Sequence, residues 1–183
     1  MNTIACLGWG SLVWSPEALP VELEWRKDGP DVCVEFLRQS GDGRITLVLD
    51  SSAAPVPCLW ARMTSPDMAS AAEALRVREK IPMGSFSRSV GQWFGGPSPA
   101  LIPNLEIWAA ARGIQGAVWT SLPPKLKDAV LPPSEEVVIA YLRTLKGKTL
   151  IAAEEYIRRA PVQIETPYRR RIASELGWTP QTS

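Results

Sequence analysis

The chain has 183 residues, of which 45% are hydrophobic and 21% charged, as in a compact globular domain that buries about two thirds of its unfolded surface. Its formal net charge is +1, so no large electrostatic field favours nucleic acid or an anionic membrane. It contains no histidine, which excludes Ser-His-Asp and Cys-His catalysis and histidine-ligated zinc.

The cysteine pattern favours a reducing compartment. Cys6, Cys33 and Cys58 each lie in an apolar stretch and form no CxxC motif, which is typical of reduced thiols in a protein core. No apolar run approaches the ~20 residues that span a bilayer, and no basic segment precedes the first apolar run as in a signal peptide. We therefore expect a cytoplasmic protein with no metal site and no membrane partner.

Most strands are predicted in the first half of the chain. Residues 3–7 form a short apolar run that ends at a glycine, and residues 32–39 alternate in hydrophobicity. A Ser-Gly-Asp-Gly turn then leads into residues 45–50, the predicted hairpin partner. Residues 59–63 and 118–120 are further candidate strands.

The helices are predicted from their capping signals. Ser65, Pro66 and Asp67 supply an N-cap, a proline at the first helical position and an acid in the first turn of a helix that runs to about Lys80. Three more helices are predicted over residues 134–146, 149–159 and 166–176, the first closed by Gly147.

The order of these elements predicts an α+β fold. We expect one domain over residues 1–183, with a mostly antiparallel sheet or open β-barrel flanked by helices and a helical part from about residue 134. The stretch from Pro82 to Asn104 is rich in glycine, proline and serine and is predicted to be a long surface loop.

The first candidate site follows the first predicted strand and consists of Gly8, Trp9, Gly10, Ser11 and Leu12. Glycines let the backbone turn sharply and present consecutive N–H groups to one point, which suits a carboxylate or a phosphate. The motif has no following lysine, so it is not a P-loop, and it lacks the third glycine of a dinucleotide fingerprint. A plain tight turn is the alternative interpretation.

The second candidate is Glu79. Met68, Ala72 and Leu75 form one apolar stripe on the predicted helix, and Glu79 continues that stripe, so its carboxylate should face inward. An inward carboxylate is a candidate for proton transfer. Glu73 lies off that face. The alternative is that Glu79 turns outward and forms a solvated ion pair with Arg76 or Lys80.

Both candidates lie in segments that resemble one family. The segment from Leu7 to Pro16 closely resembles the strand-and-loop signature of the γ-glutamylcyclotransferase superfamily, whose ChaC-type branch has a Tyr-Gly-Ser-Leu-Ile-Trp version. The segment from Ala74 to Glu79 is similar to the family's Leu-Asp-x-Arg-Glu segment, which carries its catalytic glutamate. The resemblance covers roughly residues 4 to 81.

The resemblance implies an activity. The family cyclises a γ-glutamyl group to 5-oxoproline and releases an amine, with no metal and no cofactor. Glu79 would act as the acid and base, and the N–H groups of the loop would hold the substrate. The implied partner is a small γ-glutamyl compound.

Two departures from the family pattern leave alternatives open. Trp9 stands where the family usually has a tyrosine, and no tyrosine follows soon after Glu79, although family members often use one to bind substrate. These departures motivate a second hypothesis, a non-catalytic ligand-binding or interaction module with the same fold. A third is a related amide-cleaving or γ-glutamylamine reaction at the same site.

Other side chains are interpreted as core or surface. Tyr141 and Tyr156 lie at apolar positions of predicted helices, where packing with a tethered hydroxyl is expected and replacement of the missing family tyrosine is the alternative. The arginine clusters at 158–159 and 169–171 have glutamates nearby, so we expect a paired, solvated surface and no nucleic-acid partner.

Overall fold

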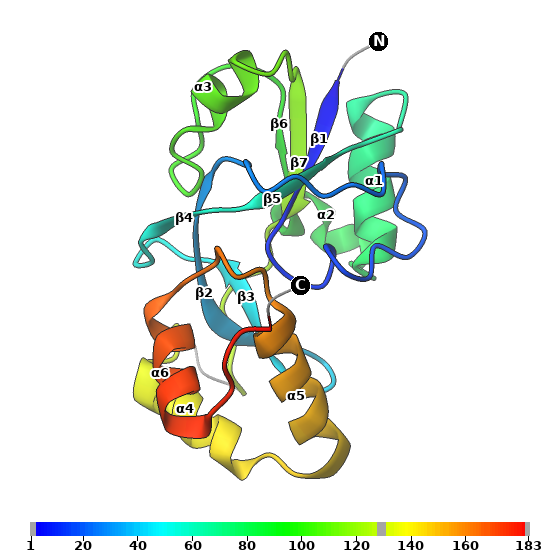
Figure 1. Ribbon diagram of the computed structural model, residues 1–183. Coiled ribbons are helices and arrows are strands. Elements are labelled where there is room, and N and C mark those ends of the chain that lie inside the picture. The colour runs from blue at the N-terminus through cyan, green and yellow to red at the C-terminus, as the bar shows by residue number, and fades with distance from the viewer. Residues whose placement is uncertain (1–2, 128–130, 182–183) are drawn as a thin grey trace.

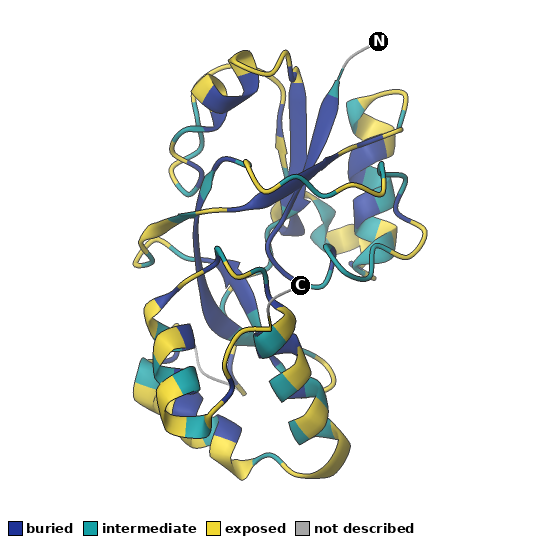
Figure 2. Ribbon diagram, in the orientation of Figure 1, coloured by how far each residue is buried: buried dark blue, intermediate teal, exposed yellow. Residues whose placement is uncertain are grey.

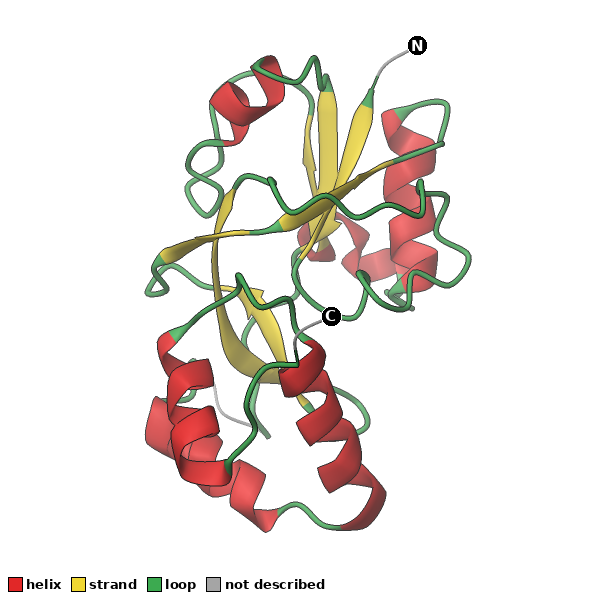
Figure 3. Cartoon of the chain, in the orientation of Figure 1, coloured by secondary structure: helices red, strands yellow, loops and turns green. Residues whose placement is uncertain are grey.

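The computed structural model describes residues 3–127 and 131–181 of the chain and contains two β-sheets with helices around them (Figure 1). The first sheet has four strands in the order β5-β1-β7-β6, and the second has three in the order β3-β2-β4. Helices and strands are both present along the chain (Figure 3), which confirms the α+β class.

The four-stranded sheet is mixed. Strand β1 (Ile4–Gly8) pairs antiparallel with β5 (Leu59–Arg62) and parallel with β7 (Gly116–Thr120), and β6 (Val90–Trp93) pairs antiparallel with β7. Helix α1 (Met68–Arg78) packs against β6 and β7. This packing places the end of α1 beside the loop that leaves β1.

The three-stranded sheet is antiparallel throughout. Strand β2 (Asp31–Gln39) pairs with β3 (Ile45–Leu49) and with the short β4 (Pro55–Pro57). Helices α4 (Glu135–Thr144), α5 (Gly147–Arg159) and α6 (Pro167–Leu176) gather on this side of the molecule, where α5 contacts β3 and α6 contacts β2 (Figure 1).

Strand β1 is apolar at every position because both of its faces are buried. Ala5 and Leu7 belong to the larger core cluster, with the tryptophans and the C-terminal helices, whereas Ile4 and Cys6 belong to a smaller cluster under α1. Alternate residues of a strand point to opposite faces, so one strand serves both clusters. In Figure 2 this strand is dark blue along nearly its whole length, while the outer faces of the helices are yellow.

The capping signals predict most helix ends, but the start of α1 and the junction of α4 and α5 differ from the structure. Asp67, rather than Ser65, is the N-cap of α1, since its side chain accepts a hydrogen bond from the Ser70 N–H at 2.8 Å. Ser134 and Thr166 are the N-caps of α4 and α6, at the first residues of the predicted ranges. Gly147 does not close α4. It begins α5 with a φ of 56°, a conformation that glycine adopts without strain.

The prediction of a long loop from Pro82 to Asn104 is wrong for its first half. A 3₁₀ turn (η1, Met83–Ser85), the short α2 (Phe86–Ser89) and β6 lie in this stretch, and α3 (Leu105–Ala110) follows it. Gly91 lies in β6 because its missing side chain leaves room for the indole of Trp119 on β7. The glycine that suggested a loop therefore serves strand packing.

No helix of the described residues is both long enough and apolar enough to cross a bilayer.

Candidate functional site

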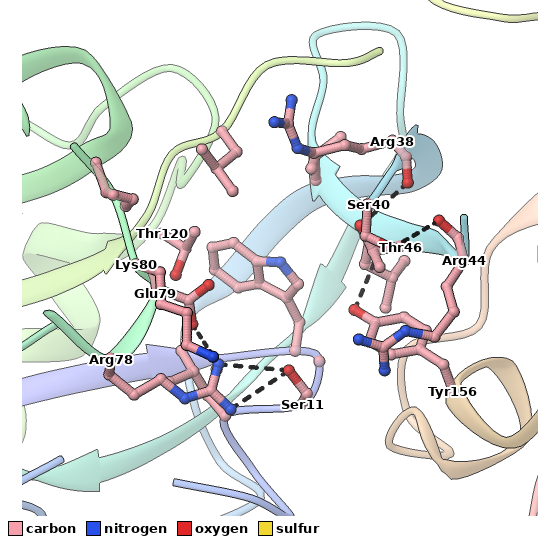
Figure 4. Close-up of a pocket in the computed structure, with 18 of the residues that line it drawn as sticks. Ser11, Arg38, Ser40, Arg44, Thr46, Arg78, Glu79, Lys80, Thr120 and Tyr156 are labelled. Atoms are coloured by element: carbon pink, nitrogen blue, oxygen red, sulfur yellow. Dashed lines mark hydrogen bonds and ion pairs between the residues drawn. The ribbon is translucent and has the colours of Figure 1, made fainter. Parts of the chain in front are cut away.

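A cavity of about 1290 Å³ lies between the two sheets. Its walls come from the loop after β1, the end of α1, the 82–89 segment, the end of β7, the β2–β3 hairpin and helix α5. Figure 4 shows Glu79 and Thr120 on one side, Tyr156 and Arg44 on the other, and Arg38 apart from both. Gly8, Trp9, Gly10, Ser11, Leu12 and Glu79 all line this one cavity.

The loop after β1 forms a compact turn with unused donors. The Val13 N–H donates to the Gly10 carbonyl at 3.0 Å, and the Ser15 N–H donates to the Ser11 carbonyl at 2.8 Å. The four N–H groups from Trp9 to Leu12 find no backbone acceptor within residues 3–127 and 131–181. Buried N–H groups are nearly always paired, so such a run suits an anionic ligand group.

Glu79 lies at the C-terminal end of α1, where its N–H still donates to the Leu75 carbonyl. Its side chain is 16% exposed, whereas that of Glu73 on the same helix is 45% exposed. Arg76 pairs with Glu73 and not with Glu79. The next residue, Lys80, turns the chain away with a φ of 55°. The carboxylate therefore faces the cavity and not bulk solvent.

Arg78 connects the loop to Glu79, and sequence reasoning did not identify it. Its Nη1 lies 2.5 Å from Glu79 Oε1, and both terminal nitrogens lie within 3.5 Å of the Ser11 hydroxyl (Figure 4). Its side chain is only 9% exposed. The sequence signal that could have identified Arg78 is its position immediately before Glu79.

Only one oxygen of the Glu79 carboxylate is engaged in this way. Oε1 accepts the hydrogen bond from Arg78, and within the described residues no donor contacts Oε2. Since the residue lines the cavity, Oε2 is the oxygen open to a ligand. Arg78 and Glu79 form a largely buried ion pair. Removing one partner of such a pair lowers the free energy of unfolding by about 3–5 kcal/mol, because the remaining charge is left uncompensated.

Tyr156 forms part of the opposite wall of the cavity. It lies on α5, is 5% exposed, and its hydroxyl accepts a hydrogen bond from the Leu47 N–H at 3.4 Å. A Cβ added to Gly10 would overlap this hydroxyl oxygen, so the glycine permits the close approach of loop and helix. The tethered hydroxyl expected from the sequence is present, and it belongs to the cavity.

Basic residues outnumber acidic ones among the residues that line the cavity. The basic residues are Arg38, Arg44, Arg78, Lys80, Arg88 and Arg159, and the acidic ones are Glu17, Asp42, Glu79 and Glu155. The chain as a whole is nearly neutral, so this local excess favours a ligand with an anionic group.

Neither of the two side chains near Glu79 that could act as a nucleophile, Cys6 and Ser11, is activated. Burial raises the pKa of the Cys6 thiol to about 12, and the charge of Glu79 adds to the rise. A thiol with this pKa stays protonated at neutral pH and does not attack a carbonyl. Ser11, whose hydroxyl contacts Arg78, has no histidine to activate it.

Other candidate residues lie away from the cavity or are paired. The arginines at 158, 159, 170 and 171 form ion pairs with the glutamates at 154, 155, 165 and 175. The prediction of a paired, solvated surface is wrong for Arg169, which is buried and donates to the carbonyls of residues 157, 160, 161 and 164. Trp60, Trp108 and Trp119 are buried core residues. No cluster of three acidic or cysteine residues within the described chain is arranged as a metal site.

Comparison with family models, with curated proteins and with solved structures finds no match to this chain.

Proposed function

We propose that the protein is a γ-glutamylcyclotransferase-like enzyme. It cleaves a small γ-glutamyl amide by intramolecular cyclisation to 5-oxoproline and needs neither metal nor cofactor. The observation that carries this proposal is that Glu79 and the Gly8–Leu12 loop, 67 positions apart at their nearest residues, line one cavity and are bridged by Arg78.

The reaction requires the protein only to align the substrate and to transfer protons. The α-amine of the substrate attacks its own γ-carbonyl carbon, the new C–N bond closes a five-membered ring, and the original amide C–N bond breaks to release an amine. Because the nucleophile and the carbonyl are in one molecule, the attack has an effective concentration of roughly 10⁵–10⁸ M once the ends are aligned.

Glu79 carries the proton in this scheme. Its free Oε2 accepts one proton from the α-ammonium group, which makes the amine nucleophilic, and passes it to the leaving nitrogen. After the attack the ring nitrogen loses a second proton by the same route, so the amine leaves as an ammonium ion. Arg78 keeps hold of Oε1 and so fixes the direction of the carboxylate. The overall reaction converts one γ-glutamyl amide into 5-oxoproline and one amine, with no net change in protons on the enzyme.

The loop binds the anionic part of the substrate. The unpaired N–H groups from Trp9 to Leu12 suit either the α-carboxylate or the negative charge that develops on the γ-carbonyl oxygen. Arg78 donates to the Ser11 hydroxyl and so fixes the position of this loop relative to Glu79.

The direct test is turnover of a panel of γ-glutamyl amides, including glutathione and γ-glutamylamines, followed by detection of 5-oxoproline. We expect Glu79→Gln to lower the rate by roughly 10²–10⁴-fold, the usual contribution of a general acid–base residue. Glu73→Gln is the matched control, since it lies on the same helix with a more exposed side chain, and it should leave the rate unchanged.

A second variant separates chemistry from folding. Glu79→Gln leaves the buried Arg78 without its partner, so the double variant Arg78→Met/Glu79→Gln restores charge balance. Both variants should show the same large loss of rate, and urea unfolding should show the double variant to be folded. Full activity in a folded Glu79→Gln protein would show that Glu79 is not the base. If no member of the panel yields 5-oxoproline with the wild type, the proposed activity is refuted.

One observation favours a second candidate, a non-catalytic ligand-binding module. The Glu79 carboxylate already has a charged partner in Arg78, an arrangement that a structural ion pair would share. This candidate predicts that the panel compounds bind by calorimetry without being cleaved, and that Glu79→Gln alters stability more than affinity.

A further inference from the structure

We propose that Tyr156 is a ligand-binding residue of the cavity, and that its hydroxyl donates a hydrogen bond to the anionic group held by the loop N–H groups. The identity of that group, the α-carboxylate of a γ-glutamyl compound, rests on the proposed function.

The side chain is held in one orientation. Trp14 packs against its ring edge-on with the centroids 5.4 Å apart, Phe36 packs at 6.5 Å, and the Arg44 guanidinium lies over the ring at 5.5 Å. A ring fixed on three sides presents its hydroxyl at a constant place, which binding requires.

The hydroxyl has an unused proton. It accepts one hydrogen bond from the Leu47 N–H, and no acceptor for its own O–H is found among the described residues. Burial raises the pKa of Tyr156 well above its ordinary value, so the group remains a donor at every physiological pH. A buried hydroxyl normally donates as well as accepts, and here the residue lines the cavity.

The donor converges with the loop. The hydroxyl oxygen lies so close to Gly10 that a Cβ there would overlap it. Gly10 is also in the middle of the segment whose N–H groups have no backbone acceptor in the described part of the chain. Amide donors from one wall and a phenol donor from the other therefore reach the same point, as a carboxylate requires.

Tyr141 shows what a purely structural tyrosine looks like in this fold. It lies on α4, and its hydroxyl donates to the Gly43 carbonyl and accepts from the Gln39 side chain, each at 2.7 Å. Its donor is already used, and it is not among the residues that line the cavity. Tyr141→Phe is therefore the matched control for Tyr156→Phe.

The test compares 5-oxoproline with its carboxamide, two ligands that differ only in the anionic group. Calorimetry gives the Kd of each for the wild type, Tyr156→Phe and Tyr141→Phe, and kinetics give the KM of a γ-glutamyl amide. A hydrogen bond to a charged group contributes enough to expect a roughly 10–100-fold loss for the carboxylate ligands in Tyr156→Phe. The carboxamide oxygen accepts only a neutral hydrogen bond, so its loss in Tyr156→Phe should be clearly smaller than that of the carboxylate, and Tyr141→Phe should match the wild type throughout.

Two results would overturn the role of Tyr156 without contradicting the proposed function. One is an unchanged affinity of Tyr156→Phe for the carboxylate ligand. The other is an equal loss of affinity for carboxylate and carboxamide, which indicates a general effect on structure. Urea unfolding of the variant shows whether the lost Leu47 contact destabilises the fold. A wild-type protein that neither cleaves a γ-glutamyl amide nor binds 5-oxoproline contradicts the proposed function and this assignment together.

Discussion

Gly10 is the residue at which the loop after β1 and helix α5 approach most closely. The hydroxyl of Tyr156 occupies the space that any side chain at this position would need. The tyrosine ring cannot retreat easily, because Trp14 and Phe36 pack against it.

We therefore expect Gly10→Ala to lower the free energy of unfolding by about 1–3 kcal/mol, the usual cost of overpacking a filled site. It should also weaken 5-oxoproline binding, since the loop must shift. Chemical denaturation and calorimetry measure the two effects. Gly84→Ala is the control, because a Cβ there meets nothing within 4 Å. Equal stability of the two variants would contradict the close contact.

Sequence reasoning found the loop and Glu79 because each carries a local signal, a Gly-x-Gly after a strand and a carboxylate on an apolar stripe. It did not identify Arg78 and offered Tyr156 only as an alternative to the missing family tyrosine, because the contacts of both residues depend on distant partners. Arg78 matters through Ser11 and Ser15, and Tyr156 through Gly10 and Leu47. No spacing within one segment reports such contacts.

Among the elements, helix α6 is fixed to strand β2 by the buried carboxylate of Glu35. Its Oε1 accepts hydrogen bonds from the Phe36 N–H and the Thr166 hydroxyl, and its Oε2 accepts one from the Tyr168 N–H. Thr166 is the N-cap of α6, so the carboxylate supports the positive end of this helix.

Burial raises the pKa of Glu35 above its ordinary value of 4.5, although the hydrogen bonds from Thr166, Phe36 and Tyr168 oppose the rise. A raised folded-state pKa means that the protonated form is favoured in the folded protein. The stability that Glu35 contributes is therefore fully present below pH 4.5 and is lost as the pH rises through the raised value.

Glu35→Gln cannot titrate, so the difference in free energy of unfolding, wild type minus variant, should fall as the pH rises across this window and stay constant above it. Urea denaturation of both proteins at a series of pH values measures this difference. A difference that grows with pH would show that the hydrogen bonds outweigh the burial.

The elements predicted best are those with a capping residue or a buried apolar run, such as α6 with Thr166 and Gly177 and the strand at Ile4–Gly8. The stretch from Pro82 to Asn104 was predicted worst. Its glycines and prolines are typical of loops, but Gly91 lies in a strand because Trp119 needs the space. Local composition does not reveal a packing partner that lies 28 positions away.

At the scale of the whole molecule, the cavity lies where the two core clusters meet. Leu7, Trp9 and Tyr156 belong to the larger cluster and Leu12 and Ile81 to the smaller one, and all five line the cavity. A ligand in this place contacts both halves of the molecule at once.

We expect a bound ligand to slow amide hydrogen exchange in both walls, in residues 8–13 and 79–82 on one side and around Tyr156 on the other. Helix α3, which lines no part of the cavity, should exchange at the same rate with and without ligand. Exchange measured by mass spectrometry at saturating 5-oxoproline tests this, and protection confined to one wall would place the ligand elsewhere.

The residues that line the cavity extend from Leu7 to Arg159. During synthesis on the ribosome, Glu79, the loop after β1 and the β2–β3 hairpin emerge early, but the part of the facing wall that α5 supplies is translated much later. A chain that has not yet been translated as far as α5 therefore carries Glu79 and the loop but lacks Tyr156 and Arg159, so this part of the cavity wall is still missing.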